Sequence, residues 1–291
     1  MQPISRRGFI AAASAGVGAG LSLTHPRLAN AGDDHSALKK ATDVVTLGDT
    51  GLTCSMLGMG TGTFGGREQR ELGTDGFTAL VRHAMDRGLN YIDTADQYRM
   101  HVFVQIALQD VQRDKYFIQT KTRAKTTEVA EADITRFIRE LGCRHLDTCL
   151  MHCMTEGDWP TTMQPVMDVL SKAKEDGKVR AVGVSCHTLE ALQAASECDW
   201  VDVILARINH VGTKMDDSPD VVSPIIQKMH AKGVGVIGMK IYGEGAFQEY
   251  EQRVKSLEYV LGLNAVDAFT IGFSSTDQID ETLDTIETIL A

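Results

Sequence analysis

Residues 268–290 read Ala-Phe-Thr-Ile-Gly-Phe-Ser-Ser-Thr-Asp-Gln-Ile-Asp-Glu-Thr-Leu-Asp-Thr-Ile-Glu-Thr-Ile-Leu. The first part, Ala268–Phe273, is a short apolar run, which is typical of a buried strand. In the second part, Thr276–Leu290, apolar residues recur every three or four positions with acidic residues between them, as in an amphipathic helix. The recurring residues are Ile279, Leu283, Ile286 and Leu290. The stretch therefore predicts one strand followed by one helix.

The same unit recurs upstream, and together the repeats predict eight strands that alternate with helices. The expected strands are Ser55–Thr61, Asn90–Ala95, Tyr116–Thr122, Leu146–His152, Val179–Ser185, Val201–Asn209, Val234–Ile241 and Ala268–Phe273. The expected helices are Asp75–Arg87, His101–Asp110, Glu128–Leu141, Thr162–Asp176, Leu189–Glu197, Ser218–Lys232, Gln248–Leu261 and Thr276–Leu290. Glycines suited to a left-handed C-cap follow four of these helices, at Gly88, Gly142, Gly177 and Gly233. Eight alternations favour an α/β fold, a closed (β/α)8 TIM barrel.

The alternative is an open, doubly wound sheet, which usually carries a G-x-G-x-x-G motif after its first strand. Glycines do gather near the first barrel strand, but neither a matching helix start nor a suitably spaced acid follows them. We therefore favour the closed barrel, over residues 43–291. A hairpin from Val44 through Asp49-Thr50-Gly51 to Thr53 is expected to precede it and to cover its bottom.

The N-terminus has the pattern of an export signal. Residues 4–10 read Ile-Ser-Arg-Arg-Gly-Phe-Ile, a weakly apolar stretch follows, and Ala29-Asn30-Ala31 matches an A-x-A-like cleavage site. The paired arginines resemble the twin-arginine (Tat) motif, and a general secretory signal is the alternative. We expect a signal peptide over residues 1–31 with cleavage after Ala31, a linker over 32–42, contact with the Tat export machinery, and a periplasmic or otherwise exported protein.

The apolar stretch of this signal is too short and too rich in glycine to form a stable membrane anchor. The resemblance to the twin-arginine motif implies export of the folded protein, often with a cofactor in place. The net charge of the 291 residues is −10, which disfavours binding to nucleic acid. The six cysteines include Cys149 and Cys153 beside His152, but no second closely spaced pair completes a zinc site, so no metal is expected.

Four polar residues follow or end consecutive predicted strands, where a barrel of this type places its active site. They are Asp93, Tyr98, Lys121 and His152. Singly, each has an ordinary structural explanation, such as a loop cap, a surface aromatic, a solvated lysine or a core histidine. Together they form a coherent acid site, in which Tyr98 and His152 donate hydrogen bonds to a carbonyl oxygen. We expect Asp93 to orient Lys121, and Lys121 to lower the pKa of Tyr98.

The spacing Asp93-Thr94-Ala95-x-x-Tyr98, with Lys121 and His152 after the next two strands, resembles the catalytic tetrad of the aldo-keto reductases. The resemblance extends from about Val44 to the end of the chain. It implies an NAD(P)(H)-dependent oxidoreductase that transfers hydride between nicotinamide and a small aldehyde, ketone or alcohol, with Tyr98 as general acid/base. One departure follows the tyrosine, where Arg99-Met100-His101 replaces the usual glycine and glutamate-bearing helix start.

The resemblance also implies a set of cofactor-binding positions, several of which depart from the common pattern. Cys186 stands where asparagine is usual, Leu205 replaces a glutamine, and the last loop lacks the Lys and Arg that commonly hold a 2′-phosphate. We expect either NADP(H) or NAD(H) to bind. The residues expected to contact it are Ser185, Cys186, Met239, Lys240, Gly243, Ser274, Ser275 and Gln278.

Phe64, Trp159 and Tyr242 fall on predicted loops at the mouth and are candidates for an apolar substrate wall, with ordinary packing as the alternative for each. Arg99 is a further candidate, with a solvated loop arginine as the alternative. Two rival functions are kept open: a dinucleotide-binding, redox-sensing or regulatory barrel with little turnover, and a cofactor-independent isomerase or lyase.

Overall fold

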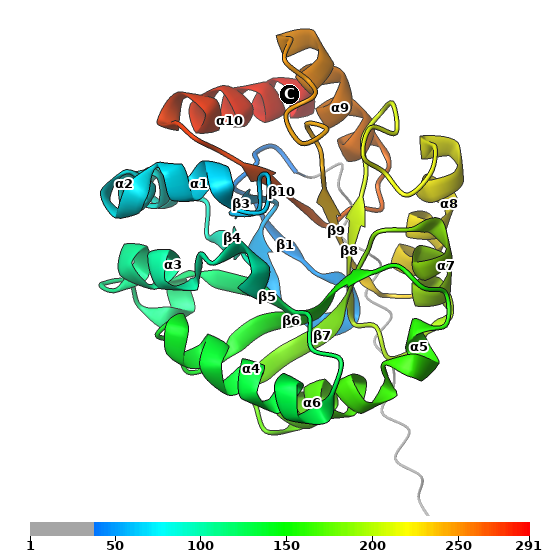
Figure 1. Cartoon of the computed structure of the whole chain (residues 1–291). Helices are drawn as coiled ribbons and strands as arrows, with labels where there is room; N and C mark the ends of the chain where they lie inside the picture. Colours follow the sequence, from blue (N-terminus) through cyan, green and yellow to red (C-terminus); the bar gives the residue numbers. More distant parts are fainter. Residues whose placement is uncertain (1–37) are drawn as a thin grey trace, which may run out of the picture. The chain divides into compact units, whose positions relative to one another are not determined.

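The computed structural model describes residues 38–291. Its parallel strands form a closed barrel in the order β10-β3-β4-β5-β6-β7-β8-β9, and helices surround them (Figure 1). The barrel strands are β3 (Leu57–Gly60), β4 (Tyr91–Asp93), β5 (Phe117–Thr122), β6 (Leu146–Met154), β7 (Val179–Cys186), β8 (Val203–Arg207), β9 (Gly235–Met239) and β10 (Ala268–Gly272). The predicted (β/α)8 barrel is confirmed.

The helices follow the predicted pattern with two additions, the short helices α1 and α5. The α-helices are α1 (Arg67–Glu71), α2 (Gly73–Asp86), α3 (His101–Leu108), α4 (Thr127–Glu140), α5 (Trp159–Thr162), α6 (Gln164–Glu175), α7 (Leu189–Glu197), α8 (Pro219–Ala231), α9 (Tyr250–Gly262) and α10 (Thr276–Leu290). Three 3-10 turns are η2 (Gly48–Thr50), η3 (Asp96–Tyr98) and η4 (Arg113–Lys115). The four glycines expected at helix C-caps all have positive φ, between 62° and 97°.

A hairpin closes the N-terminal end of the barrel. Strand β1 (Val44–Thr46) pairs antiparallel with β2 (Thr53–Ser55), as predicted. In the connection, the Gly48 amide donates to the Asp267 carboxylate (3.3 Å) and the Asp49 amide donates to the Gly233 carbonyl (2.8 Å). Asp267 precedes β10 and Gly233 precedes β9, so the hairpin covers the bottom and leaves the C-terminal ends of the strands open.

The expected signal peptide, residues 1–31, lies outside the described residues, as does most of the expected linker, 32–42. The described end of that linker is packed rather than free. Ala41 is buried, and its carbonyl accepts a hydrogen bond from the Leu57 amide (2.9 Å) because the chain runs alongside the start of β3. None of the helices within residues 38–291 is long and apolar enough to cross a membrane.

The alternation of side chains along the strands decides which of them reach the site. In β5, Gln119 and Lys121 point into the barrel, where Gln119 donates to the Tyr91 hydroxyl (2.9 Å). Thr120 and Thr122 point outward and bond to side chains of α3 and α4. Strand β5 therefore directs Lys121 into the barrel, while its two neighbours, Thr120 and Thr122, bond to the surrounding helices.

Candidate active site

The four side chains expected to converge do meet at the C-terminal end of the barrel. Lys121 is fully buried, and its Nζ donates to Asp93 Oδ1 (2.6 Å) and to the Thr94 carbonyl (2.8 Å). The Tyr98 hydroxyl lies 3.4 Å from His152 Nε2, with the two rings nearly perpendicular, at 87°. The arrangement is a buried ion pair beneath two side chains that can donate hydrogen bonds to one oxygen atom.

The protonation state of Tyr98 differs from the sequence-based expectation. Burial, followed by the nearby Asp93 carboxylate, raises the pKa of Tyr98 well above its ordinary value of 10. Lys121 does not lower it, because its Nζ lies 5.1 Å from the centre of the Tyr98 ring and bonds to Asp93 and Thr94 instead. The expected effect of Lys121 on the pKa of Tyr98 was therefore wrong for this structure, which keeps the phenol protonated and ready to donate.

His152 is held in its neutral form. Burial, and then the positive charge of Lys121, lower the pKa of His152 to about 2. The side chain is buried, and its Nδ1 atom has no hydrogen-bond partner among the described residues. At ordinary pH the neutral imidazole keeps one ring N–H, so it can donate a hydrogen bond through Nε2, but it lacks the second, acidic proton of an imidazolium.

A cavity of about 600 Å³ opens beside Tyr98 and runs between α1, α9 and the start of α10. Three of the expected cofactor-binding residues line it: Met239, Lys240 and Gln278. Gly62 lets the chain pass close to the tyrosine, because a Cβ there would lie 2.6 Å from the Tyr98 ring. At the far end, Ser275 caps α10, so the first amides of this helix face the region next to Gln278. The volume, the small residues and the helix N-terminus fit a dinucleotide.

Comparison with known proteins decides the family. A sequence model described as "Aldo/keto reductase family" matches residues 56–260, more than half of the chain. The chain belongs to the aldo/keto reductase family. Solved structures agree in fold: one from Pseudomonas aeruginosa aligns with a TM-score of 0.74 at 23% identity, over 87% of this chain and 99% of its own. An aldo-keto reductase from Bacillus halodurans, in its holo form, gives 0.68 at 19%, over 84% and 91%.

Curated relatives are distant. Aldo-keto reductase YhdN of Bacillus subtilis (strain 168) is 26% identical over 196 residues, 60% of this chain and 56% of that protein. The NADH-specific methylglyoxal reductase of Escherichia coli (strain K12) is 23% identical over 202 residues, 60% and 61% of the two chains. L-galactose dehydrogenase of Arabidopsis thaliana is 25% identical over 278 residues, 81% and 85%. The match thus spans less than two thirds of the length of the first two relatives.

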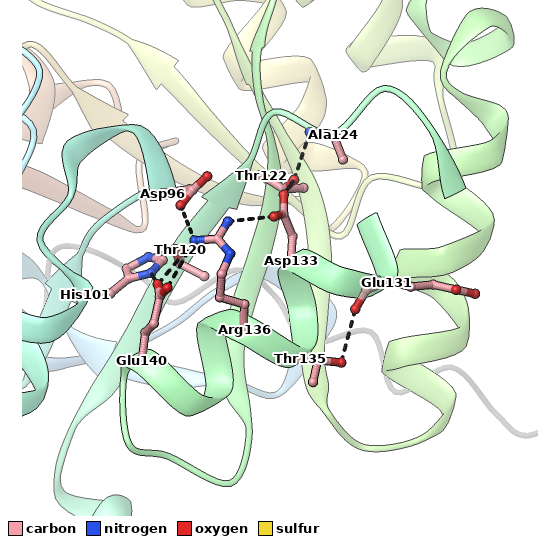
Figure 2. A network of polar contacts seen from close by, with 10 residues as sticks. All are labelled: Asp96, His101, Thr120, Thr122, Ala124, Glu131, Asp133, Thr135, Arg136 and Glu140. Atoms are coloured by element: carbon pink, nitrogen blue, oxygen red, sulfur yellow. Dashed lines mark hydrogen bonds and ion pairs between the residues drawn. The ribbon is translucent and has the colours of Figure 1, made fainter. Parts of the chain in front are cut away.

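In this aldo/keto reductase, helix α4 holds the two segments that carry Tyr98 and Lys121 (Figure 2). Arg136 donates to Asp96 Oδ1 (2.6 Å) in η3, the turn that ends at Tyr98, and to Asp133 Oδ1 (2.6 Å). Asp133 in turn accepts from Thr122 Oγ1 (2.5 Å), the residue after Lys121. The guanidinium of Arg136 on α4 therefore connects η3, which ends at Tyr98, with the end of β5, which contains Lys121: it bonds to Asp96 directly and to Thr122 through Asp133.

The network continues on the other side of Lys121. His101 contacts Glu140 Oε2 (2.9 Å) through Nδ1 and Thr120 Oγ1 (2.8 Å) through Nε2. The ligand atoms of Asp96, His101 and Glu140 lie within 4.8 Å of one another, a spacing that could suit a cation. Arg136 already bonds to the carboxylates of Asp96 and Glu140, so its guanidinium supplies the positive charge between them.

The cations along the cavity are paired with carboxylates. Lys240 donates to Glu244 (2.6 Å). Arg253 donates to Glu281 on α10 (2.7 Å). Arg67 lies 3.8 Å from Glu71. Each positive charge that lines the groove thus has an acidic partner within the groove itself, which leaves little positive potential for an additional phosphate.

The remaining expected cofactor residues lie away from the lining of this cavity. Ser185 is buried at the end of β7, and its Oγ accepts a hydrogen bond from the Cys153 amide (2.9 Å). Cys186 is buried behind it, and burial, then Asp216, raise the pKa of its thiol far above the ordinary value. Gly243 has φ of 60° in the loop after β9, the left-handed region that favours glycine.

The last loop bonds to itself. Gln278 Oε1 accepts from the Ser274 amide (2.8 Å) and hydroxyl (3.2 Å), and the Ser275 side chain accepts from the Gln278 amide (3.3 Å). These contacts occupy the acceptor of Gln278 and leave its amide NH2 as a donor. The loop carries no Lys or Arg, as its sequence indicated.

The three aromatic candidates divide. Phe64 and Tyr242 line the cavity, and Phe64 is exposed, at 52%. Trp159 does not line the cavity. It is fully buried between α5 and α7, and its Nε1 donates to the Ala191 carbonyl (3.1 Å). Arg99 is exposed with φ of 57°, so it adopts the left-handed conformation that suits the glycine usual at this place. The expectation for Trp159 was wrong.

The sequence analysis missed several polar residues of this site. Gln119 donates to Asp93 Oδ1 (2.8 Å) and accepts from Thr148 (2.9 Å), which fixes the carboxylate from below. Its signal was its place two residues before Lys121, on the same side of the strand. The contacts of α4 were hidden, because Asp133, Arg136 and Glu140 are indistinguishable in sequence from an ordinary solvated face.

Proposed function

We propose that this protein is an NAD(P)(H)-dependent oxidoreductase acting on a small carbonyl or alcohol substrate, with Tyr98 as the general acid/base. The observation that carries the proposal is the pairing of a protonated, partly buried Tyr98 with His152 Nε2 at 3.4 Å, at the edge of a cavity that fits a dinucleotide. The family membership and the relatives named as reductases or dehydrogenases support it.

When bound, the cofactor supplies or accepts the hydride. The chain's own part is to hold the substrate oxygen between the Tyr98 hydroxyl and His152 Nε2, and to pass the phenolic proton to that oxygen as negative charge develops on it. Asp93 and Lys121 form the buried ion pair beneath the phenol, and Lys121 also holds the Thr94 carbonyl. In the oxidative direction the same groups act in reverse.

For the cofactor itself, we propose a preference for NAD(H) over NADP(H). The support is that Lys240 and Arg253 are already neutralised by Glu244 and Glu281, and that the loop from Ser274 to Gln278 carries no cation. The name of the NADH-specific Escherichia coli relative points the same way. Of the expected residues, the groups that line the cavity and that we propose to hold the cofactor are Met239, Lys240 and Gln278.

We further propose that residues 1–31 direct export through the twin-arginine route, so that the protein acts in the periplasm or outside the cell. The support is the Arg6-Arg7 pair, the short apolar stretch and the Ala29-Asn30-Ala31 site. Because such a compartment is not expected to supply free dinucleotide, the cofactor would enter with the folded protein and stay bound through paired oxidation and reduction.

The test is to purify the protein from the periplasm without dialysis and to identify any released dinucleotide by mass spectrometry. We expect stoichiometric NAD, and turnover of generic aldehydes by the same preparation. A protein that binds neither dinucleotide at millimolar concentration, about 4 kcal/mol of affinity, contradicts the proposal. Tight binding without turnover would favour a sensing or regulatory role instead.

A further inference from the structure

Arg123 lies at the mouth, one step above the buried lysine of the tetrad. It follows Lys121 by two residues and comes directly after β5, which ends at Thr122. Its Nη1 donates to Gln97 Oε1 (3.1 Å), and Gln97 immediately precedes Tyr98. The Arg123 guanidinium is exposed and lies beside the loop that carries the proton donor.

Three other cations, Lys121, Lys240 and Arg207, also act on His152 or Cys153, and each of the three has an acidic partner. Lys121 pairs with Asp93. Lys240 pairs with Glu244. At the end of β8, Arg207 Nε donates to the buried Asp216 (2.9 Å), and Arg207 Nη2 bonds to the same oxygen.

Arg123 differs from these cations. Within residues 38–291, no carboxylate forms an ion pair with it, and its hydrogen bond goes to a neutral amide. Of the four cations that act on the Cys153 thiol, namely Arg123, Lys121, Arg207 and Lys240, Arg123 is thus the one without an acidic partner in the described residues, although the chain as a whole is acidic. A negatively charged group on a ligand could therefore pair with Arg123.

The titrating groups beside Arg123 respond to this excess of positive charge. Cys153 lies 3.5 Å from His187 Nε2, on the strand ends next to His152. Burial, and then Arg207, lower the pKa of His187 to about 4, and Arg123 acts in the same direction. Burial raises the pKa of the Cys153 thiol, while Arg123 is the first of the cations that oppose it. His152, His187 and Cys153 are therefore uncharged, and none of them neutralises the positive charge of Arg123.

We propose that the substrate carries a carboxylate, which Arg123 binds while Tyr98 and His152 hold the carbonyl or hydroxyl oxygen. The substrate class is thus a short-chain aldehyde acid, keto acid or hydroxy acid. This inference rests on the proposed oxidoreductase function and narrows it to an anionic substrate. The planar guanidinium matches a carboxylate in a fork of two hydrogen bonds.

A phosphorylated substrate fits less well. A phosphate monoester carries nearly two negative charges, whereas only one of the four cations that act on Cys153, Arg123, is unpaired. Arg207, Lys240 and Lys121 would each have to leave a carboxylate to supply the second. We therefore commit to the carboxylate.

The test compares 4-oxobutanoate with its neutral methyl ester as substrates for the full chain, at saturating NADH. We expect the wild type to have the higher kcat/KM with the acid, through a lower KM, and to lose this advantage as salt is added. In Arg123→Ala the ratio of kcat/KM values, acid over ester, falls about tenfold or more, which corresponds to about 1.4 kcal/mol. Arg123→Lys keeps part of the preference, because it keeps the charge but not the fork.

The matched control is Lys125→Ala, which removes an exposed positive charge from the same loop and should leave the ratio unchanged. Reduction of the ester without any preference for the acid overturns this inference alone, as does an equal loss with both substrates in Arg123→Ala. A larger preference for glyceraldehyde 3-phosphate over glyceraldehyde than for acid over ester also overturns it. A protein that binds NADH but reduces none of these aldehydes removes the proposed function, and the inference with it.

Discussion

The tetrad and the dinucleotide groove lie side by side but are built differently. In the tetrad, Lys121 and Asp93 are buried, and each hydrogen bond that fixes them comes from a barrel strand or from the segment directly after it. In the groove, the charged pairs Lys240–Glu244 and Arg253–Glu281 are partly exposed and lie on loops and helices. A substitution in the tetrad therefore disturbs several hydrogen bonds at once, whereas a substitution in the groove disturbs a single charged pair.

The difference indicates where evolutionary change is tolerated. Removing one partner of a buried ion pair leaves an uncompensated charge in the barrel, so the residue types of the tetrad are fixed together. A half-exposed pair contributes little to stability, so the groove is free to alter its choice of cofactor. Two departures from the family pattern, Cys186 and the last loop without Lys or Arg, fall on the cofactor side, whereas the four tetrad residues keep the family's types.

The largest effect is expected for Lys121→Met. It leaves Asp93 with Gln119 as its remaining side-chain donor, so we expect the free energy of unfolding to fall by about 3 kcal/mol and reductase activity to fall by at least about a thousandfold. Chemical denaturation and steady-state kinetics measure the two effects. The double variant Asp93→Asn with Lys121→Met removes both charges and should regain stability without regaining activity. Retained activity in either variant would contradict the account.

A smaller effect is expected for Arg136→Met in α4. The substitution removes the donor shared by Asp96 and Asp133, so unfolding should become easier by about 1–2 kcal/mol. Because the turn that carries Tyr98 loses its anchor, kcat should fall about tenfold with little change in the KM for NADH. Arg136→Lys should recover part of the loss. If Arg136→Met loses stability but keeps its full kcat, the network is structural and does not position the tyrosine.

On the groove side, Glu281→Gln should free Arg253 to meet a 2′-phosphate. We expect the dissociation constant for NADPH to decrease about tenfold, about 1.4 kcal/mol, with little change for NADH, as measured by fluorescence titration. The matched control is Glu287→Gln, an exposed position on the same helix outside the cavity lining. Wild-type protein that already prefers NADPH by more than about tenfold would refute the proposed preference for NAD(H).

The smallest effect is expected from pH. The pKa of His152 is lowered to about 2, so the residue is neutral throughout the usual range, and the pKa of Tyr98 is raised, so its proton is lost only in strong alkali. The kcat/KM for reduction should therefore stay level from about pH 5 to about pH 10 and fall only in stronger alkali, as the phenol ionises. An inflection near pH 6.5 that disappears in His152→Gln would show that the histidine titrates as an acid.

The sequence was most informative where one pattern determines one element. Helices α7 and α10 begin and end at the predicted residues, because each has a clear apolar period and a Thr or Ser N-cap, at Thr188 and Ser275. The tetrad was predictable because the ends of parallel strands meet at one edge of the barrel.

The sequence was least informative where polar residues meet across elements. Helix α1 was missed, because Arg-Glu-Gln-Arg-Glu offers no apolar period to detect. Trp159 was placed at the mouth from its predicted loop, but its ring turns inward because the indole N–H finds the Ala191 carbonyl. The direction of the Tyr98 pKa shift could not be predicted either, since it depends on burial and on the 5.1 Å between Lys121 Nζ and the ring.

The central claim is that Tyr98 gives its proton to the substrate oxygen during hydride transfer. The most direct test is a single-turnover measurement of NADH oxidation by an aldehyde, in wild type and in Tyr98→Phe, with NADH binding determined on the same samples. We predict unchanged NADH binding and melting temperature, with a hydride-transfer rate at least about a hundredfold lower in the variant. A variant that binds NADH and transfers hydride at the wild-type rate would contradict the account.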